Sequence, residues 1–275
     1  MTGAAFGPAT EIDDIDRIRT VCTSFIRSVL TEADADGVVV GLDGELESTT
    51  AATLAVEALG PERVYGLVLP SSKLGSKGAR EAEAIAEALG IESETVHLQP
   101  LLMCFGDMAP AHTDLHGDPI ARENLVARLR MTMWYLAANA MERLVVGSTT
   151  RTELLLGTFS KHGDGAADLL PLGGLYRTEV EALAEAFDVP SFAIEPSDIE
   201  SCYPDHIGVD RTGLDVAPAT IDAVLRRLVE GERDPEKLQA ALEIDVDREA
   251  VERIVRHHRL TEHKRRRPPV GPTIE

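Results

Sequence analysis

Cysteines, export signals and long apolar runs are scarce or absent in this chain. It has three cysteines in 275 residues, Cys22, Cys104 and Cys202, which lie far apart and form no C-x-x-C pair. This spacing indicates neither a disulfide framework nor a zinc cluster, and it fits a reducing compartment. The N-terminal segment has no basic stretch followed by an apolar one, and no run approaches the ~18 apolar residues of a membrane span. We therefore expect a cytoplasmic protein that is neither exported nor embedded in a membrane.

Basic residues, and lysine above all, are also in short supply. Lys and Arg total 27 against 47 Asp and Glu, which gives a formal net charge of −20, and only five of the basic residues are Lys. A chain of this sign repels a phosphate backbone, which excludes nucleic-acid binding by charge neutralisation. The composition resembles that of proteins from salt-accumulating microbes, in which salt screens the self-repulsion. We interpret the acidity as halophilic adaptation.

The chain also lacks the composition of a disordered protein. Hydrophobic residues make up 44% of it, with 22 glycines and 15 prolines, which is enough apolar material for one large or two small cores. We find no internal repeat and no long linker, so we expect a single domain over residues 1–275. Its last part, 259–275, is a basic tail; taken alone, this tail is typical of a solvated terminus.

Hydrophobic periodicity predicts alternating strands and helices. Residues 37–42 are all apolar and rich in valine, as expected for a strand that is buried on both faces of a parallel sheet. Further strands are predicted at 63–69, 94–98 and 143–147. Helices are predicted at about 13–31, 48–59, 78–89, 120–140 and 175–187, followed by an irregular segment at 190–215 and three helical stretches up to residue 258. This order predicts an α/β fold with a doubly wound, Rossmann-like parallel sheet and flanking helices, and ligands at the carboxyl ends of the strands.

Two segments follow predicted strands and are candidates for binding phosphate or metal. The first, 41–48, begins a helix whose free amides can receive phosphate oxygens, but it carries the anions Asp43, Glu45 and Glu47. On its own it is also explained as a capped turn. In the second, Ser148 suits a phosphate and Glu153 suits a metal, although a helix cap with a solvent-facing glutamate explains the same residues.

Two further segments carry basic and polar groups. Arg128 and Arg130 are two residues apart on a predicted helix, so they lie on different faces and at least one points towards the apolar side or a partner. The alternative interpretation places both side chains at the surface. The loop that follows residue 157 is rich in polar groups. In it Lys161 offers a donor and Asp168 an acceptor, and two glycines allow a close approach to a ligand.

Taken together, these segments resemble the ammonia-dependent NAD synthetases of the ATP-pyrophosphatase superfamily, whose fold is of the adenine nucleotide alpha hydrolase type. The resemblance covers about residues 15–269. It rests on ARxRMT at 127–132, ELLLG at 153–157, KxGDGxADLLP at 161–171, GLYRT at 174–178 and HKR at 263–265. It implies a carbon–nitrogen ligase in which ATP activates the nicotinate carboxylate of deamido-NAD as an acyl-adenylate. Ammonia then displaces AMP to give NAD. Mg²⁺ and basic groups are needed to absorb the charge of the departing pyrophosphate.

The resemblance also assigns residues to each substrate. Carried over by position, ATP would be contacted by Gly41, Leu42, Asp43, Gly44, Glu45, Leu46, Glu47, Ser48, Ser148, Arg177 and Ser197. Deamido-NAD would be held by Arg128, Lys161, Asp168, His263 and Lys264. Mg²⁺ would be ligated by Glu47 and Glu153. The family also implies a homodimer whose contact uses the helix that contains Arg128.

The ATP loop departs from the family pattern Ser-Gly-Gly-x-Asp-Ser. Asp43 replaces the serine, Glu45 a glycine at a position that could require positive φ, and Glu47 the metal-binding aspartate; Arg177 stands in place of a lysine. Three hypotheses follow. The chain is a working synthetase in which further cations bridge the loop and the phosphates. It is an impaired paralogue that binds deamido-NAD or NAD as a sensor or regulatory subunit. Or it acts on another carboxylate.

Overall fold

The computed structural model describes most of the chain. Its described residues are 12–71, 77–113, 115, 117–187, 189–190, 216–242 and 246–272, and the side chains of residues 12 and 13 are not among them. Ser197, Cys202 and most of the irregular segment predicted at 190–215 lie outside these residues. Within them, Cys22 and Cys104 are free thiols, and no helix is long and apolar enough to cross a membrane.

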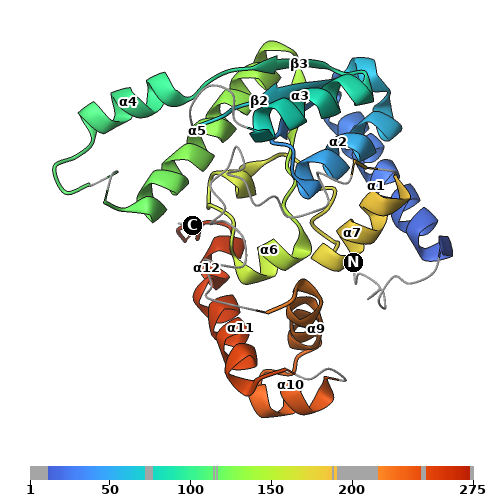
Figure 1. Cartoon of the computed structure of the whole chain (residues 1–275), viewed down its shortest axis with the longest axis vertical. Coiled ribbons are helices and arrows are strands. Elements are labelled where there is room, and N and C mark those ends of the chain that lie inside the picture. The colour runs from blue at the N-terminus through green and yellow to red at the C-terminus, as the bar shows by residue number, and fades with distance from the viewer. Residues whose placement is uncertain are drawn as a thin grey trace.

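A four-stranded parallel sheet forms the centre of the fold (Figure 1). The strands are β1 (Gly37–Leu42), β2 (Val64–Val68), β3 (Glu92–Thr95) and β4 (Arg143–Val146), in the spatial order β3-β2-β1-β4. In the register, Val39 of β1 lies opposite Tyr65 of β2 and Val145 of β4. Nearly every residue of β1 and all of β2 are buried, which explains their unbroken apolar sequences.

Helices cover both faces of this sheet, as a doubly wound fold requires. One core joins β1 to α1 (Ile12–Ala33), α2 (Leu46–Leu59), α3 (Lys77–Leu89) and α7 (Arg177–Ala186). A second core, on the other face, packs Val39, Tyr65 and Val145 against α5 (Pro119–Ala140). The predicted α/β class, parallel sheet and flanking helices are therefore confirmed.

The C-terminal helices form a third core beside the sheet domain. The helices are α9 (Pro218–Val229), α10 (Pro235–Ala241) and α11 (Arg248–Leu260), and α12 (Glu262–Arg265) follows them. Their apolar side chains pack with Leu156 of α6 (Arg151–Leu156) and with Tyr176. In Figure 1 they extend away from the sheet below α6. The three helical stretches predicted before residue 258 are thus confirmed.

Two parts of the prediction need correction. The third strand was expected at 94–98 but is Glu92–Thr95, because pairing with β2 starts at Glu92. The chain still follows β2 beyond the strand, since the amides of Val96 and Leu98 donate to Val68 and Pro70 at 2.9 Å. The helix α4 (Gln99–Met108) was not predicted, and none of its residues is buried.

Candidate active site

The candidate site lies where the direction of the strand order reverses. From β1 the chain proceeds to β2 and β3 on one side, while β4 pairs on the other side of β1. The segments that follow β1 and β4 therefore diverge at the carboxyl edge of the sheet, which is where doubly wound folds bind ligands. The helices α2 and α6 begin directly after these two strands, so their free amides and positive ends lie at the same edge.

The β1–α2 loop turns at Gly44. This glycine has φ of +88°, and a Cβ there would lie 2.9 Å from the carbonyl oxygen of Gly78, so a larger residue would be both strained and crowded. Glu45, which follows it, has φ of −90° and forms the N-cap of α2. The concern that Glu45 requires positive φ is therefore wrong: an L-residue fits the backbone at this position.

Asp43 organises the loop through its carboxylate. Its Oδ1 accepts hydrogen bonds from the amide of Glu45 at 2.9 Å and from the hydroxyl of Ser48. Burial raises the pKa of Asp43 to about 6, opposed by these hydrogen bonds and by the charge of Arg130. The segment is thus a capped turn, as its sequence alone suggested, and the carboxylate engages two donors that a phosphate could use.

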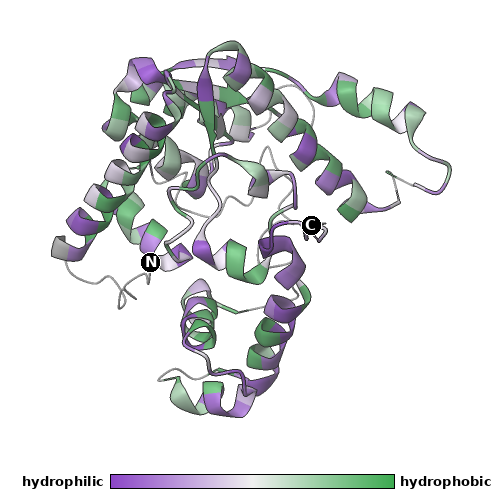
Figure 2. Ribbon diagram, turned by 180° about the vertical axis from the view of Figure 1, so that it is seen from behind, coloured by the Kyte–Doolittle hydropathy of each residue, from purple (hydrophilic) through white to green (hydrophobic). Residues whose placement is uncertain are grey.

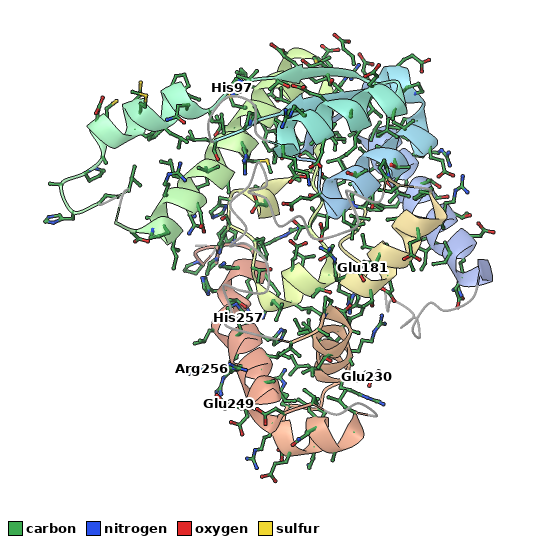
Figure 3. All side chains as sticks on the ribbon, viewed as in Figure 1. His97, Glu181, Glu230, Glu249, Arg256 and His257 are labelled. Carbon is green, nitrogen blue, oxygen red and sulfur yellow. The ribbon has the colours of Figure 1, made fainter. Side chains whose placement is uncertain are left out.

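Glu47, Arg177 and Glu153 form a charged group between α2, α7 and α6. Arg177 donates from Nη1 to Glu47 and from Nε to Glu181 at 2.9 Å; Glu181 lies on α7 (Figure 3). Glu153 accepts from the amide and hydroxyl of Thr150 at 2.7 and 2.8 Å, which completes a capping box at the start of α6. Burial, reinforced by the negative charge of Glu47, raises the pKa of Glu153 to about 7. The helix cap is confirmed, but its glutamate is turned onto the cap and does not face solvent.

Metal-ligating groups at this edge are limited in number. In the described part of the chain, no group of three or more His, Cys, Asp and Glu side chains is placed to hold a metal ion. The two carboxylates predicted for Mg²⁺, Glu47 and Glu153, are nevertheless close enough for the charge of one to raise the pKa of the other. Ser148 lies between β4 and α6, half-buried at the same edge.

The two arginines of α5 lie on different faces, as predicted. Arg130 is 1% exposed and donates from Nε to the carbonyl of Leu69, at the end of β2, at 3.1 Å. Arg128 is exposed and donates from Nε to the carbonyl of Lys161 at 3.2 Å. The alternative in which both lie at the surface is wrong. Arg128 contacts the backbone of the loop predicted to hold the second substrate.

Residues about 100 positions apart in the sequence meet at this second loop. Lys161 donates from Nζ to the carbonyl of His263 at 2.8 Å. Lys264 donates from Nζ to the carbonyls of Gly157 and Phe159 at 2.7 and 2.9 Å. The structure therefore brings together four of the five residues predicted to hold deamido-NAD: Arg128, Lys161, His263 and Lys264. The first part of the basic tail, with His263 and Lys264, is packed here against the loop, whereas residues 266–272 are exposed to solvent.

The fifth residue, Asp168, is anchored to the sheet. Its Oδ1 accepts from the hydroxyl of Tyr135, and its Oδ2 accepts from the amide of Val145, both at 2.8 Å. Tyr135 also donates to the carbonyl of Ala166 at 2.8 Å, so one α5 side chain fixes the end of the loop to β4. Sequence reasoning missed Tyr135, because a tyrosine within a helical sequence gives no signal of its partner.

The glycines of this loop have an internal packing role. A Cβ on Gly165 would lie 2.5 Å from the ring of Phe159, and one on Gly163 would lie 2.9 Å from Cβ of Ala127. These positions therefore need glycine to close the loop against α5 and Phe159. A close approach to a ligand, which the sequence suggested, remains a prediction.

Side chains from α11 and α12 satisfy the last carbonyls of α6. Thr261 and Arg265 donate to Leu156 and Leu155 at 2.7 and 2.8 Å, and Nδ1 of His258 lies 2.7 Å from the carbonyl of Leu155. The last carbonyls of a helix find no N–H donors inside it, so the side chains of the C-terminal segment supply these donors. α6 is thereby fixed at both ends, by its capping box at the sheet edge and by the tail at its far end.

Comparisons with known proteins agree on one family. The NAD synthase family model matches residues 18–268. The NH(3)-dependent NAD(+) synthetase of Methanosarcina acetivorans is 36% identical over 258 residues, 94% of this chain and 98% of that protein. The protein of the same name from Hyperthermus butylicus is 37% identical over 93% of this chain and 90% of its own length.

Solved structures give the same result. The NH3-dependent NAD synthetase from Campylobacter jejuni has a TM-score of 0.77 at 25% identity, covering 94% of this chain and 99% of that chain. The NMN synthetase from Francisella tularensis also has a TM-score of 0.77, at 28% identity, covering 98% of this chain and 100% of that chain.

Proposed function

Because this chain belongs to the NAD synthase family, we propose that it catalyses the ATP-dependent amidation of deamido-NAD with ammonia. The nicotinate carboxylate attacks the α-phosphate of ATP and releases pyrophosphate, and the C–O bond of the resulting acyl-adenylate is then replaced by a C–N bond as AMP leaves. A carboxylate repels nucleophiles, so it must first receive such a leaving group. The observation that carries this proposal is the family match over residues 18–268.

The switch-point edge suits the ATP half of this reaction. The proposed ATP contacts are residues 41–48, Ser148, Arg177 and Ser197, of which Ser197 lies outside the described residues. The start of α2 supplies amides and a positive helix end, and Arg177 adds a full positive charge at the same place. Groups of this kind stabilise the negative charge that develops on a departing pyrophosphate.

The donor chemistry of this edge also fits Mg²⁺. Mg²⁺ is commonly held by one or two carboxylates together with the phosphates of a substrate, so two neighbouring glutamates are a sufficient protein contribution. Glu47 and Glu153 would hold the ion. When bound, it supplies positive charge that neutralises the phosphate oxygens. Arg177 forms an ion pair with Glu47 in this structure, so its positive charge lies close to the proposed position of the phosphates.

The loop of residues 158–168 suits the deamido-NAD half. Arg128, Lys161, His263 and Lys264 gather there, with Asp168 at its end. Lys161 donates to one backbone carbonyl and Lys264 to two, which fixes the positions of both ammonium groups at the loop. Deamido-NAD carries two phosphates and a carboxylate. A cluster of basic side chains in an otherwise acidic protein is complementary to these negative charges.

A second copy of the chain fits the exposed apolar surface of α4 and the start of α5. Figure 1 shows α4 extending away from the body of the protein, and Figure 2 shows it largely in apolar colours. The exposed apolar side chains here are Leu101, Met103, Phe105, Met108 and Ile120. Several exposed apolar side chains on one short helix favour an interaction site. We assign it to a homodimer, which is consistent with the predicted use of α5.

The direct test is formation of NAD from deamido-NAD. The purified protein is incubated with ATP, Mg²⁺, ammonium and deamido-NAD in molar KCl, and NAD, AMP and pyrophosphate are measured. We expect all three in equal amounts. Because one solved relative is named an NMN synthetase, the deamidated form of NMN is assayed in parallel; preference for it would support the hypothesis of another carboxylate.

The same assay decides the remaining alternative. The relatives above are all named as synthetases, which gives no support to an impaired sensor or regulatory paralogue. If the protein binds deamido-NAD but forms no AMP above a blank, the synthetase proposal is refuted and the sensor hypothesis takes its place.

A further inference from the structure

One buried carboxylate connects the C-terminal helix α9 to the edge of the sheet where ATP is proposed to bind. Asp222 is 2% exposed, and both of its oxygens are used. Oδ1 accepts from the hydroxyl of Thr152, on α6, at 2.6 Å. Oδ2 accepts from the amide and the hydroxyl of Thr178, on α7, at 3.0 and 2.9 Å. One side chain of α9 therefore joins the two helices that carry Glu153 and Arg177.

This carboxylate completes the N-terminus of α7. The first amides of a helix have no partner inside it. The amide of Arg177 donates to the hydroxyl of Thr152 at 2.9 Å, and that hydroxyl donates in turn to Asp222. The next amide, of Thr178, donates to Asp222 directly. A negative charge at this end of the helix is also favoured by the helix dipole. The direction and position of the first turn of α7 thus depend on Asp222.

The side chain of Arg177 extends from that first turn to the loop of residues 41–48, the proposed phosphate-binding loop, hereafter the phosphate loop. Its guanidinium donates to Glu47, which lies in the first turn of α2, and to Glu181. The chain of contacts therefore runs from Asp222 through Thr152 to the backbone of Arg177, and through its side chain to the loop after β1. A displacement of the first turn of α7 moves a rigid, directional donor away from the place where the phosphates are proposed to bind.

Neighbouring groups offset the unfavourable effect of burying the Asp222 carboxylate. Burial raises its pKa, opposed by the three hydrogen bonds and by the charge of Arg226. Arg226 lies one turn further along α9 and forms an ion pair with Glu179 at 2.7 Å. The side chain of Glu179 accepts from the amide of Tyr176 at 2.8 Å. α9 thus holds the start of α7 by two adjacent polar contacts, and the contact through Asp222 is the one linked to Arg177.

We propose that Asp222 is a positioning residue for the ATP half of the reaction: it acts through Thr152 and the first turn of α7 to hold Arg177 over the phosphate loop. This inference rests on the proposed function insofar as Arg177 contacts ATP. It assigns to the C-terminal helices a role in nucleotide binding that is exerted through the contacts of Asp222 with α6 and α7.

The test compares the affinities for the two substrates, measured separately by calorimetry. Asp222→Ala and Thr152→Val each break the chain of hydrogen bonds, and we expect each to weaken ATP binding by about tenfold or more, since hydrogen bonds to a charged group are lost. The dissociation constant for deamido-NAD should stay unchanged. Asp222→Asn keeps one oxygen acceptor and should have a smaller effect. Arg227→Ala, on the same helix but in an exposed ion pair with Glu230, is the matched control and should change neither constant.

A double-mutant cycle separates positioning from general loss of structure. If Asp222 acts through Arg177, Asp222→Ala should have little further effect on ATP binding in an Arg177→Ala background. Circular dichroism shows which variants are folded at the temperature of the measurement. If Asp222→Ala does not fold, the milder Thr152→Val is tested in the same cycle.

The outcomes are distinct from those of the activity assay. Unchanged ATP affinity in both variants, an equal loss for both substrates, or a full additional loss in the Arg177→Ala background would each overturn the role of Asp222. A wild-type protein that binds ATP but forms no amide refutes the proposed function alone, and the ATP affinities of the variants still decide the inference. A wild-type protein that does not bind ATP refutes both.

Discussion

Asp43 is the residue whose chemistry differs most from what a phosphate loop is expected to offer. Its carboxylate accepts from the Glu45 amide and the Ser48 hydroxyl, so it stabilises the turn before any nucleotide arrives. The same carboxylate places a negative charge beside the proposed position of a polyphosphate. At 4 Å, two like unit charges repel by about 1 kcal/mol in water and about 4 kcal/mol at an effective dielectric constant of 20. The residue therefore preorganises the loop and weakens nucleotide binding at the same time.

We expect Asp43→Ser to lower the KM for ATP by about fivefold or more, because it removes this repulsion and frees the two donors. The KM for deamido-NAD should not change. The matched control is Asp36→Ser, at the exposed amino end of β1, which removes the same charge far from the loop. An unchanged or increased KM for ATP in Asp43→Ser would show that the loop needs this carboxylate for nucleotide binding.

Glu153 makes the stability of the ligand-free protein depend on pH. Its pKa rises from 4.5 in the unfolded chain to about 7 in the folded protein, chiefly through burial. The folded state then binds a proton that the unfolded state releases, so the stabilisation is complete below about pH 4.5 and is lost as the pH rises towards 7. Glu153→Gln keeps an oxygen for the amide of Thr150 but does not titrate.

We therefore expect Glu153→Gln to reduce the fall in melting temperature between pH 5 and 7, measured without nucleotide or metal at constant salt. Asp43 also titrates in this range, with a pKa of about 6, so some slope should remain. The comparison is with Glu181→Gln, which neutralises a neighbouring glutamate on α7. If the two variants and the wild type share one pH profile, Glu153 is ionised in the folded protein throughout this range.

At the scale of elements, the accuracy with which the sequence predicted a helix or strand depended on how deeply that element is buried. The strand at 37–42 and the helix at 120–140 were located to within one residue, because both are largely buried and their sequences are correspondingly rich in apolar residues. The edge strand β3 begins two residues and ends three residues earlier than predicted, since its Glu-Ser-Glu-Thr sequence is mostly exposed. The residues around Lys161 and His263 were grouped only through a family resemblance. Periodicity cannot show that segments 102 residues apart share a hydrogen bond.

The exposed helix α4 gives a prediction at this scale. Met103 and Met108 are 63% and 82% exposed, which is costly for apolar side chains unless a partner covers them. We expect the wild-type protein to be a dimer by light scattering, and Met103→Glu with Phe105→Glu to produce a folded monomer. The control is Val229→Glu, at an exposed apolar position on α9. A wild-type monomer, or a dimer that tolerates both α4 substitutions, would exclude this surface as the dimer contact.

At the scale of the whole molecule, the dominant quantity is the net charge of −20. Like charges distributed over a folded chain repel one another, and unfolding relieves this repulsion by moving them apart. Salt shortens the Debye length from about 10 Å at 0.1 M to about 3 Å at 1 M, which removes most of the long-range repulsion between these charges. The protein should therefore be least stable in dilute buffer. The exposed ion pairs contribute little against this, since such pairs are each worth at most about 1 kcal/mol and are also screened.

We expect the melting temperature to rise by at least about 4 °C between 0.1 M and 1 M KCl, which corresponds to a gain of 1–2 kcal/mol for a chain of this size. The effect of charge is separated from other effects of salt by a variant with the same fold and fewer charges. Glu87→Gln, Asp107→Asn and Glu249→Gln together alter three exposed acidic residues and change the net charge from −20 to −17. Their combined variant should melt higher than wild type at 0.1 M KCl and approach it at 1 M. If both proteins gain equally from salt, screening of the acidic surface is not the cause of the stabilisation, and the interpretation of the composition as halophilic adaptation loses its physical basis.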